Sequence, residues 1–487
     1  MKTKTLGIIG GLGELAGADL FGKLVKAHAR QADRAPCHFL YEQHPYRDAG
    51  VALTHGMRMT SRKLYVFQTS QAFAARQADA ILLPCFASHV FRDEIQSELD
   101  IPVLDMMDAL RCHVGKTVVP GGSLGILTSD FTREAKLFER YFGERYRLVY
   151  PLPQQQSRLM DAVYGPHGLQ AGHADDGVLD RVEQSCRDLL EQPVDLLLPG
   201  FTELALVSAF LALRGIELPD INEIYAEFAL AGSGPIKPPP FKLGIVGGVG
   251  PAATVDFMGK VIRNTPAGCD QDHIKMVVEQ NPQIPDRTAH LLHGSTDPSV
   301  ALLATCQRLE AEGAQAIAIP CNTAHAFVGE IQPYLSVPII NMLSTTVAHI
   351  QQRFGRTQTV GLLATAGTVA CRVYHAIAER AGLRLIVPEP AYQDKVMNVI
   401  YGEFGVKAGY TDGRCKAELL EVAAHLVEAG AGILILGCTE LPLLLQQTEH
   451  YEIDGRSVAL IDPTEVLAQR CVQLAKPSVP ATVAFGE

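Results

Sequence analysis

The stretch AIPCNTAH at residues 318–325 ends an apolar, strand-like run at a cysteine that small polar residues follow. The stretch LGCTEL at residues 436–441 repeats this arrangement after the apolar run GILILG. In an open α/β sheet, ligands bind at the carboxyl ends of strands, where loop amides and hydroxyls converge. We therefore expect Cys321 and Cys438 to be two thiols that face one pocket.

The composition is that of a globular protein of several compact units. The chain has 487 residues, of which 47% are hydrophobic and 20% charged, with a net charge of −11. The negative charge and the lack of Lys/Arg runs argue against nucleic acid as a partner. No apolar stretch reaches the roughly 18 residues of a membrane span, and the N-terminal apolar run is broken by glycines, as in a first strand. We expect a soluble, cytoplasmic protein without membrane partners.

The eleven cysteines are scattered singly, and none forms a CxxC pair. A zinc ribbon or a disulfide framework would show paired spacing, so we expect no metal site and no disulfide set. Most of the cysteines are expected to be small core residues. These are Cys37, Cys112, Cys186, Cys269, Cys306, Cys371, Cys415 and Cys471.

An internal duplication organises the chain. Several blocks of the first half recur in the second half in the same order and at nearly constant spacing, which indicates two tandem copies of one unit. The matched blocks are LGIIGGLG (6–13) with LGIVGGVG (243–250), LPCFASHVFRDEIQ (83–96) with IPCNTAHAFVGEIQ (319–332), IPVLDMM (101–107) with VPIINML (337–343), MDAVYGPHGLQAGH (160–173) with MNVIYGEFGVKAGY (397–410), and LLLPGFTELAL (196–206) with LILGCTELPLL (434–444). We predict units at 1–232 and 242–475, a Gly/Pro linker at 233–241, and a tail at 476–487.

Each unit is predicted to be α/β, with parallel sheets flanked by helices. In the second unit, continuous apolar runs alternate with stretches of helical period such as residues 298–313. Apolar strands that alternate with helices are typical of a parallel sheet covered on both faces. The predicted strands fall into two groups, before and after about Ser344, and the two cysteine blocks divide between them. We expect two lobes related by pseudo-twofold symmetry, with a cleft between them.

The glycine-rich turn at 247–250 follows a strand, so nucleotide binding must be weighed. In that fingerprint an acidic residue should follow the second strand, whereas Asp270 and Asp272 precede it. No Lys-Ser/Thr pair follows the glycines, as a phosphate-binding loop would require. A tight turn shaped to a small ligand is the favoured interpretation.

The two cysteines suggest acid–base chemistry. A cysteine acts as a base only as its thiolate, which a following helix N-terminus would favour. Thr323 and Thr439 are candidates to cap such helices or to hold a carboxylate. His325 is a candidate to orient a thiol, but a structural role is at least as well supported, because His89 persists in the other copy. Thiols on opposite faces of a carbon can remove and deliver a proton; a disulfide is the competing interpretation, disfavoured in a reducing compartment.

Residues 242 to about 475 resemble the aspartate/glutamate racemase superfamily, in particular aspartate racemases that need no pyridoxal phosphate. The resemblance rests on VGGVGP (246–251), EQNPQIPDRT (279–288), PCNTAH (320–325), VKAG (406–409) and GCTEL (437–441). It implies a cofactor-independent two-base mechanism in which Cys321 and Cys438 each deprotonate one enantiomer at Cα.

The resemblance also implies the substrate-binding residues. Asn322, Thr323 and Thr439 would bind the α-carboxylate and the amino group of an acidic amino acid. Ala324 and Glu440, in the same two cysteine motifs, are further substrate-binding candidates. Arg287 and Lys407 match the basic residues that such racemases use for the side-chain carboxylate. Taken singly, Arg287 is better explained by a surface salt bridge and Lys407 by a solvated loop; their occurrence together with both cysteines favours the site.

The first unit departs from this pattern. It keeps Cys85, but Phe86 and Ala87 replace Asn322 and Thr323, and Phe201 replaces the second cysteine. Gln170 replaces Lys407, Glu14 replaces Pro251, and Arg47 lies out of register in a shortened segment. We predict that the first unit does not racemise amino acids and is either a structural partner of the second unit, in an intramolecular pseudo-dimer or a homo-oligomer, or a binder of a different ligand.

The leading hypothesis is therefore racemisation of an acidic amino acid in the second unit, with aspartate as the first candidate and glutamate as the second. Two alternatives remain open from the sequence. One is an isomerase that acts on another dicarboxylate, such as maleate, and the other is a non-catalytic protein that binds an acidic metabolite.

Overall fold

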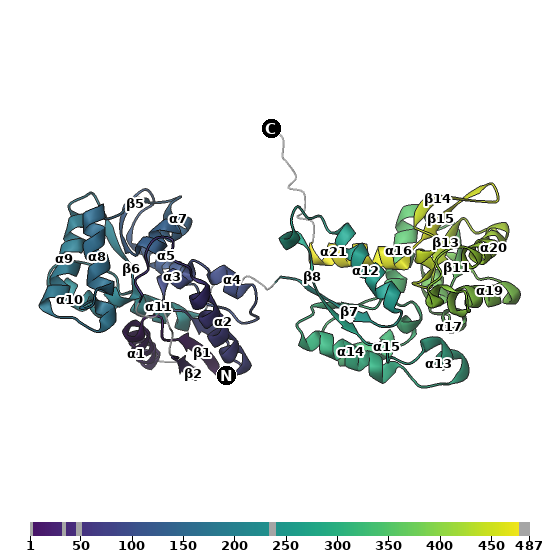
Figure 1. Cartoon of the computed structure of the whole chain (residues 1–487), viewed down its shortest axis with the longest axis horizontal. Helices are drawn as coiled ribbons and strands as arrows, with labels where there is room; N and C mark the ends of the chain where they lie inside the picture. The colour runs from purple at the N-terminus through teal and green to yellow at the C-terminus, as the bar shows by residue number, and fades with distance from the viewer. Residues whose placement is uncertain (1–2, 32–35, 45–50, 233–239, 477–487) are drawn as a thin grey trace. The chain divides into compact units, whose positions relative to one another are not determined.

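The computed structural model describes residues 3–31, 36–44, 51–232 and 240–476. The chain divides into two compact units, residues 1–239 and 240–487 (Figure 1). Arg47, most of the predicted linker at 233–241 and nearly all of the predicted tail at 476–487 lie outside the described residues.

The second unit contains two sheets. The first has the strand order β10-β9-β7-β8 and is entirely parallel. The second has the order β12-β11-β13-β15-β14. The strands are β7 (Lys242–Gly247), β8 (Lys275–Gln280), β9 (Ala316–Ala318), β10 (Ile339–Ile340), β11 (Thr359–Leu363), β12 (Arg384–Ile386), β13 (Ile433–Leu436), β14 (Thr448–Ile453) and β15 (Arg456–Ile461).

Helices surround both sheets (Figure 1). They are α12 (Pro251–Asn264), α13 (Arg287–His293), α14 (Ser299–Ala311), α15 (Val328–Ile331), α16 (Met342–Phe354), α17 (Ala366–Ala370), α18 (Val373–Arg380), α19 (Pro390–Tyr401), α20 (Arg414–Glu428) and α21 (Pro463–Ala475), with 3-10 turns η3 (Asp270–Asp272), η4 (Thr323–Ala326), η5 (Gln332–Tyr334), η6 (Val406–Ala408) and η7 (Leu441–Leu443).

Strand β7 shows how the first sheet is buried on both faces. Leu243 and Ile245 belong to one apolar cluster with Phe257 of α12 and Leu467 of α21. On the other face, a Cβ at Gly244 would lie 3.2 Å from the Cβ of Leu309, so α14 packs directly on the strand there. Since successive side chains of a strand point to opposite faces, a continuous apolar run is what such a double cover requires.

The prediction of parallel sheets flanked by helices is confirmed, with one addition. The predicted strands of the second unit are all present, but the hairpin of β14 and β15 was not predicted. β15 pairs parallel with β13, whereas β14 pairs antiparallel with β15. Its turn contains Asp454 and Gly455 with φ of 49° and 73°, the backbone that an Asp-Gly hairpin turn requires.

The first unit repeats this plan with two smaller sheets, ordered β2-β1-β3 and β5-β4-β6. A single parallel bridge between Ile81 and Val103 stands where the second unit has the β9–β10 pairing. Its elements are β1 (Lys4–Ile9), α1 (Glu14–Arg30), β2 (Cys37–Glu42), α2 (Thr60–Ala75), β3 (Ala80–Leu82), α3 (Phe86–His89), α4 (Arg92–Gln96), α5 (Met106–Thr117), β4 (Ser123–Thr128), α6 (Asp130–Glu134), α7 (Leu137–Phe142), β5 (Arg147–Val149), α8 (Pro153–Tyr164), η1 (Leu169–Ala171), α9 (Asp176–Leu190), β6 (Leu196–Gly200), η2 (Thr202–Leu206), α10 (Ser208–Leu213) and α11 (Ile221–Ala231).

The duplication extends to backbone detail. Lys136 and Arg372, at equivalent places before α7 and α18, are both left-handed, with φ of 52° and 54°. Few residues other than glycine adopt this conformation, so its recurrence at matched positions supports the alignment of the two units.

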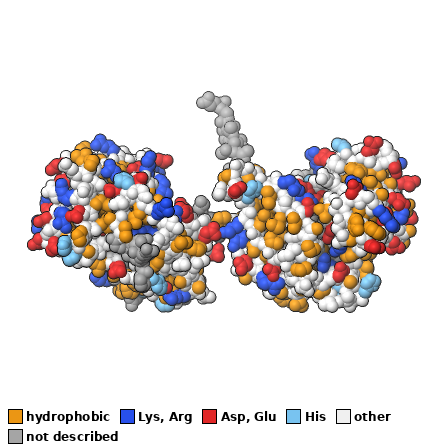
Figure 2. Space-filling view, in the orientation of Figure 1, with side chains coloured by type: hydrophobic (Ala, Val, Ile, Leu, Met, Phe, Trp, Pro, Cys, Tyr) orange, Lys and Arg blue, Asp and Glu red, His pale blue; other side chains and the backbone are white. Residues whose placement is uncertain are grey.

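The surface mixes acidic and basic side chains with apolar ones on the face drawn in Figure 2. No helix of the described residues is long and apolar enough to cross a membrane. The expectation of core cysteines is wrong for Cys112 and Cys269, which are exposed, whereas Cys186, Cys306, Cys415 and Cys471 are buried.

Candidate active site

The two cysteines of the second unit lie after strands of its two different sheets. Cys321 comes after β9 and Cys438 after β13, and each is 6% exposed. The helix N-termini predicted behind them are absent from the described residues: the 3-10 turn η4 comes after Cys321, and η7 comes after Cys438. Turns this short have little macrodipole, so any stabilisation of a thiolate must come from side chains and individual amides.

Arg287 accompanies Cys321. It is the first residue of α13 and only 8% exposed. Its Nη1 donates to the carbonyl oxygens of Ile284 and Pro285 at 3.4 and 3.1 Å, and its Nη2 donates to that of Val249 at 3.1 Å. Burial opposes the charge, but the Cys321 sulfur, chiefly, raises the pKa of Arg287 above its ordinary value. The guanidinium is therefore a fixed cation beside this sulfur.

Glu440 accompanies Cys438. The Sγ of Cys438 donates to Oε2 of Glu440 at 3.1 Å, and the Thr439 hydroxyl donates to the same oxygen at 3.3 Å. The other carboxylate oxygen, Oε1, lies 3.9 Å from Nζ of Lys407. Burial and then the Glu440 carboxylate raise the pKa of Cys438 well above its ordinary value. The geometry is that of a protonated thiol that donates to a carboxylate.

Removing this carboxylate charge should make Cys438 more reactive. In Glu440→Gln the pKa of Cys438 should fall, because a neutral amide no longer opposes the thiolate, so the thiolate fraction near pH ~8 should rise. We expect alkylation of Cys438 by iodoacetamide to speed up about three- to tenfold, as followed by peptide mass spectrometry. The matched substitution in the first unit, Glu203→Gln, should leave this rate unchanged; slower alkylation in Glu440→Gln would contradict the assignment.

Lys407 interacts electrostatically with both cysteines. It is half-buried, and its Nζ lies 4.6 Å from the centre of the Tyr401 ring. Burial opposes its charge, but Glu440 first, then Tyr401 and the sulfurs of Cys438 and Cys321, raise the pKa of Lys407 above its ordinary value. The ammonium therefore interacts with both sulfurs, as expected if the two thiols face one pocket.

Asn322 and Thr323 are held by residues that the sequence did not point to. Tyr374 donates to Oδ1 of Asn322 at 2.6 Å, while Nδ2 of Asn322 has no partner among the described residues. The Thr323 hydroxyl lies 3.1 Å from that of Thr365 and 2.8 Å from that of Thr368. These contacts fix the two side chains and leave one buried donor of Asn322 unused.

His325 and its first-unit counterpart His89 make the same structural contacts. The Nδ1 of His325 bonds to the carbonyl oxygen of Cys321 at 2.9 Å, and its Nε2 accepts from the backbone N–H of Met342 at 3.0 Å. His89 makes the same contacts with Cys85 and Met106, each at 3.0 Å. Burial lowers the pKa of both histidines. A neutral ring with both nitrogens engaged has no free proton to exchange.

The glycine turn comes close to the same carboxylate. Gly250 has a φ of 134°, and a Cβ there would lie 2.4 Å from Oε1 of Glu440. Only glycine allows such an approach without displacing the carboxylate. Gly13 and Glu203 repeat the arrangement in the first unit, at 2.5 Å. This close contact explains why a glycine is needed at position 250. It is compatible with the interpretation of the turn as one shaped to a small ligand.

In the first unit, aromatic residues fill the equivalent site. Cys85, Phe86, Phe201 and Tyr164 line a cavity of only ≈ 20 Å³, about the room for one water. The Phe201 ring meets that of Tyr164 edge-on at 5.7 Å, and Phe86 stacks on Phe138 at 5.7 Å. Phe86 and Phe138 occupy the positions of Asn322 and Tyr374, so a hydrogen-bonded pair has become an aromatic pair. That the counterparts of both cysteines line one cavity supports the shared site of the second unit.

The thiol of the first unit still has an arginine, but a different one. Nη1 of Arg62 donates to Sγ of Cys85 at 3.4 Å, and Arg62 is 1% exposed. It belongs to α2, whereas Arg287 belongs to α13. The sequence pattern drew attention to Arg47 and not to Arg62, since no local motif marks a residue that reaches the thiol from another helix.

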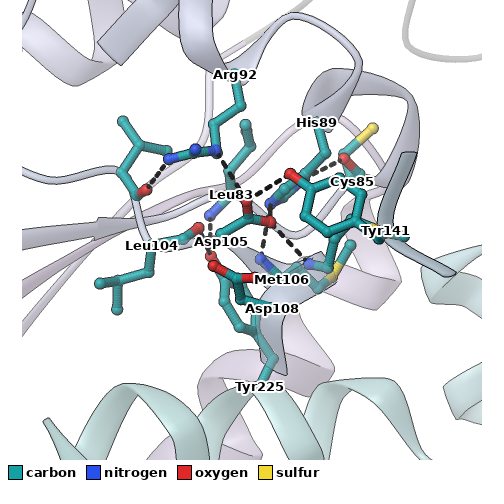
Figure 3. Close-up of polar contacts among 12 residues, drawn as sticks. Leu83, Cys85, His89, Arg92, Leu104, Asp105, Met106, Asp108, Tyr141 and Tyr225 are labelled. Atoms are coloured by element: carbon teal, nitrogen blue, oxygen red, sulfur yellow. Dashed lines mark hydrogen bonds and ion pairs between the residues drawn. The ribbon is translucent and has the colours of Figure 1, made fainter. Parts of the chain in front are cut away.

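A buried polar network lies beside Cys85 in the first unit (Figure 3). Asp105 accepts from Tyr141 at 2.6 Å and from the backbone of Met107 at 2.9 Å, and its carboxylate lies 3.2 Å from Nε of Arg92. The second unit has the neutral Asn341 at this position, which caps α16. The first unit therefore has an ion pair beside Cys85 where the second unit has the neutral Asn341.

Comparison with known proteins now places the chain in a family. Its sequence matches the model for Asp/Glu/hydantoin racemases over residues 9–229 and again over 246–471. The chain therefore belongs to the Asp/Glu/hydantoin racemase family, and both of its units do. The predicted resemblance and the tandem duplication are confirmed.

Individual relatives are amino-acid racemases. The chain is 26% identical over 235 residues to the broad specificity amino-acid racemase RacX of Bacillus subtilis, covering 47% of this chain and 96% of that protein. It is 29% identical over 192 residues to a glutamate racemase of Shewanella baltica, covering 38% of this chain and 66% of that protein. Among solved structures, the Picrophilus torridus aspartate racemase is 28% identical, with a TM-score of 0.42, and covers 48% of this chain and 94% of that chain.

Proposed function

We propose that the second unit racemises an acidic amino acid, aspartate or glutamate, without pyridoxal phosphate, with Cys321 and Cys438 as the two bases. The single observation that carries the proposal is the pair of buried thiols with a cation beside each: Arg287 by Cys321, and Lys407 by the Glu440 that contacts Cys438. Membership of a racemase family agrees with it.

Unused donors support an anionic substrate. Nε of Arg287 and Nδ2 of Asn322 are buried and have no acceptor among the described residues. Each such donor costs about 1–3 kcal/mol unless a ligand accepts from it. A carboxylate supplies acceptors of the right kind, and a charge-assisted bond to a guanidinium is about twice as strong as a neutral one. An acidic amino acid carries two carboxylates for two sets of donors.

The roles of the residues follow from their chemistry. Asn322, Thr323 and Thr439, with the backbone of Ala324, would hold the α-carboxylate. Glu440 is suited to the α-ammonium, because its negative charge attracts the ammonium and repels the two carboxylates of the substrate. Arg287 and Lys407 would hold the side-chain carboxylate.

The proton balance needs only the two sulfurs. One enters as a thiolate, breaks the Cα–H bond by taking its proton, and becomes a thiol. The other enters as a thiol, gives its proton to the opposite face of Cα, and becomes a thiolate. The cations and the hydrogen-bond donors stabilise the negative charge that develops on the α-carboxylate between the two transfers.

Racemisation in D₂O tests the proposal directly. Each turnover should place solvent deuterium at Cα, because the proton delivered comes from an exchanged thiol. We expect aspartate or glutamate, in either configuration, to interconvert with incorporation of deuterium, as measured by chiral chromatography and mass spectrometry. Isomerisation of maleate without activity on either amino acid would favour the dicarboxylate alternative. Binding of aspartate in calorimetry without exchange would favour a non-catalytic protein.

For the first unit we propose a structural role and no racemase activity. A second proton-transfer group is missing where Phe201 stands, and the cavity of ≈ 20 Å³ cannot admit an amino acid. Pairing with the second unit as a pseudo-dimer, or the formation of a homo-oligomer, remains part of this proposal.

A further inference from the structure

Four threonine hydroxyls form a buried cluster in the second unit. Thr288 of α13 and Thr323 of η4 come after strands of the first sheet, whereas Thr365, the N-cap of α17, and Thr368 within α17 come after β11 of the second sheet. Each of the four residues is at most 7% exposed. The Thr323 oxygen lies 3.1 Å from that of Thr365 and 2.8 Å from that of Thr368. The cluster therefore joins side chains from the two halves of the unit.

The first unit keeps only half of this cluster. Ser129 and Thr132 are the counterparts of the α17 pair, and their hydroxyl oxygens lie 2.8 Å apart. Ala87 replaces Thr323, and the corresponding residues 51–59 contain no helix like α13. The pair after the second sheet is thus a property of the fold. The two hydroxyls that meet it from the other half of the unit occur only in the unit that has both cysteines.

The hydrogen bonds of the cluster run in one direction, because each hydroxyl has one proton and two acceptor positions. The Thr365 oxygen accepts from the Thr288 hydroxyl and from the backbone N–H of Thr368, at 3.3 Å each, so both of its acceptor positions are taken. Thr368 is 0% exposed, and its hydroxyl contacts only those of Thr365 and Thr323 among the described residues. Since Thr365 accepts no further bond, Thr368 donates to Thr323.

This direction leaves one proton unused, and that proton belongs to Thr323. Neither hydroxyl beside it can accept, because the acceptor positions of Thr365 are filled and Thr368 is the donor in the bond that it shares with Thr323. The preceding residue, Asn322, also has an unused buried donor, Nδ2. Two unused donors on successive residues suit the two oxygens of one carboxylate, to which each bond would be charge-assisted.

From the cluster and its single unused proton, we propose that Thr365 and Thr368 are positioning residues that direct the Thr323 hydroxyl to the α-carboxylate of the substrate. They act through Thr323 and do not touch the substrate themselves. The inference rests on the proposed function for the identity of this carboxylate. Negative charge grows on the α-carboxylate while Cα is deprotonated, so a donor that is already held in place stabilises the transition state more than it stabilises the bound substrate.

A double-mutant cycle on the full chain tests whether Thr368 acts through Thr323. Thr323→Val should lower kcat/KM for aspartate about 10–100-fold, the usual effect of losing a hydrogen bond to a charged group. Thr368→Val removes a hydroxyl with little change of shape and should lower kcat/KM about three- to tenfold, since Thr323 keeps one of its two partners. The double variant should be no slower than Thr323→Val alone. Losses that multiply would overturn the proposal, because Thr368 would then act independently of Thr323.

Two further variants separate positioning from a general structural role. Thr368→Ser restores the hydroxyl and should recover kcat/KM to within about threefold of the unaltered protein. Thr132→Val breaks the matching pair in the first unit, so it should lower the temperature of thermal unfolding about as much as Thr368→Val does and leave kcat/KM within about twofold. No recovery in Thr368→Ser, or slow racemisation in Thr132→Val, would count against the proposal. If Thr368→Val does not fold, Thr368→Ala takes its place in the cycle.

Calorimetry with aspartate distinguishes this inference from the proposed function. If the chain binds aspartate without racemising it, the proposed function fails, and the same cycle measured in Kd decides the positioning role. If the chain racemises aspartate but the cycle is additive, the proposed function stands and the positioning role fails. A chain that neither binds nor racemises aspartate or glutamate would overturn both.

Discussion

Replacing Cys438 by serine should lower racemisation of aspartate by about 10³-fold or more in both directions. A serine hydroxyl neither ionises at neutral pH nor delivers a proton as a thiol does, and loss of general acid–base catalysis costs about 10²–10⁴-fold. Cys321→Ser should have an effect of the same size, because each direction uses both sulfurs. Initial rates from each enantiomer, followed by chiral chromatography, measure this.

Isotope exchange makes the same variants more informative. With one sulfur left, the enzyme can still remove and return a proton on one face of Cα. Cys438→Ser should therefore exchange the α-proton of one enantiomer with solvent deuterium while its configuration is retained, and Cys321→Ser should do so for the other enantiomer. If both variants exchanged the same enantiomer, the two sulfurs would not face opposite sides of the substrate.

The matched control is Cys85→Ser. Its sulfur lies in a cavity of ≈ 20 Å³ between aromatic rings, so this change should leave the rate within about twofold of the unaltered protein. Loss of activity in Cys85→Ser, with activity kept in Cys438→Ser, would show that catalysis belongs to the first unit instead.

Lys407→Gln, which introduces the residue found at this place in the first unit, should have the second large effect. We expect kcat/KM for aspartate to fall by about 10²–10³-fold, mainly through a higher KM, because the cation proposed to hold the side-chain carboxylate is lost. The Glu440 carboxylate, left without its cation, would also repel the substrate's side chain. Steady-state kinetics with aspartate and with alanine measure the effect.

The neutral substrate separates charge recognition from a general loss of structure. If the ammonium serves the side-chain carboxylate, any activity on alanine should fall far less than activity on aspartate. Gln170→Lys, the reverse change in the first unit, should alter neither. An equal loss with both substrates would mean that Lys407 acts at the reacting carbon or holds the site together.

The fold was predictable because its signals are local and repeated. Runs such as those of β7 and β13 are apolar at nearly every position, which a sheet covered on both faces demands, and each run occurs twice in the chain. The unpredicted hairpin of β14 and β15 has polar residues such as Glu449 and Glu452 in its outer strand. An edge strand of this kind need not be apolar, so only its Asp-Gly turn marked it.

The site was predictable only where its residues sit in motifs. The two cysteines were proposed because they follow strand ends, and Asn322 and Glu440 because their motifs resemble those of the racemase family; their part in the site stays a prediction. Tyr374, which holds Asn322, lies far along the chain, in a helix where a tyrosine has many ordinary roles. Arg62 was missed for the same reason, since its contact with Cys85 depends on how a helix crosses a sheet.

The local sequence explains why helix N-termini were expected after Cys321 and Cys438, where the structure has 3-10 turns. A strand followed by a polar run predicts a helix, but PCNTAH and GCTEL contain too few residues before the next turn to build one. The 3-10 turns η4 and η7 result. Arg287 places a positive charge beside Cys321, as a helix end was expected to do, whereas Glu440 raises the pKa of Cys438 and so acts in the opposite sense.

The stacked rings of the first unit bear on its evolutionary history. Restoring the thiol by Phe201→Cys would leave a hole beside Tyr164, and restoring the amide by Phe86→Asn would bury a polar group against Phe138, which cannot bond to it. Each reversal alone is destabilising, and only several made together would rebuild a working site. If the first unit has no racemase activity, as we propose, selection acting on single steps could not restore it at this site.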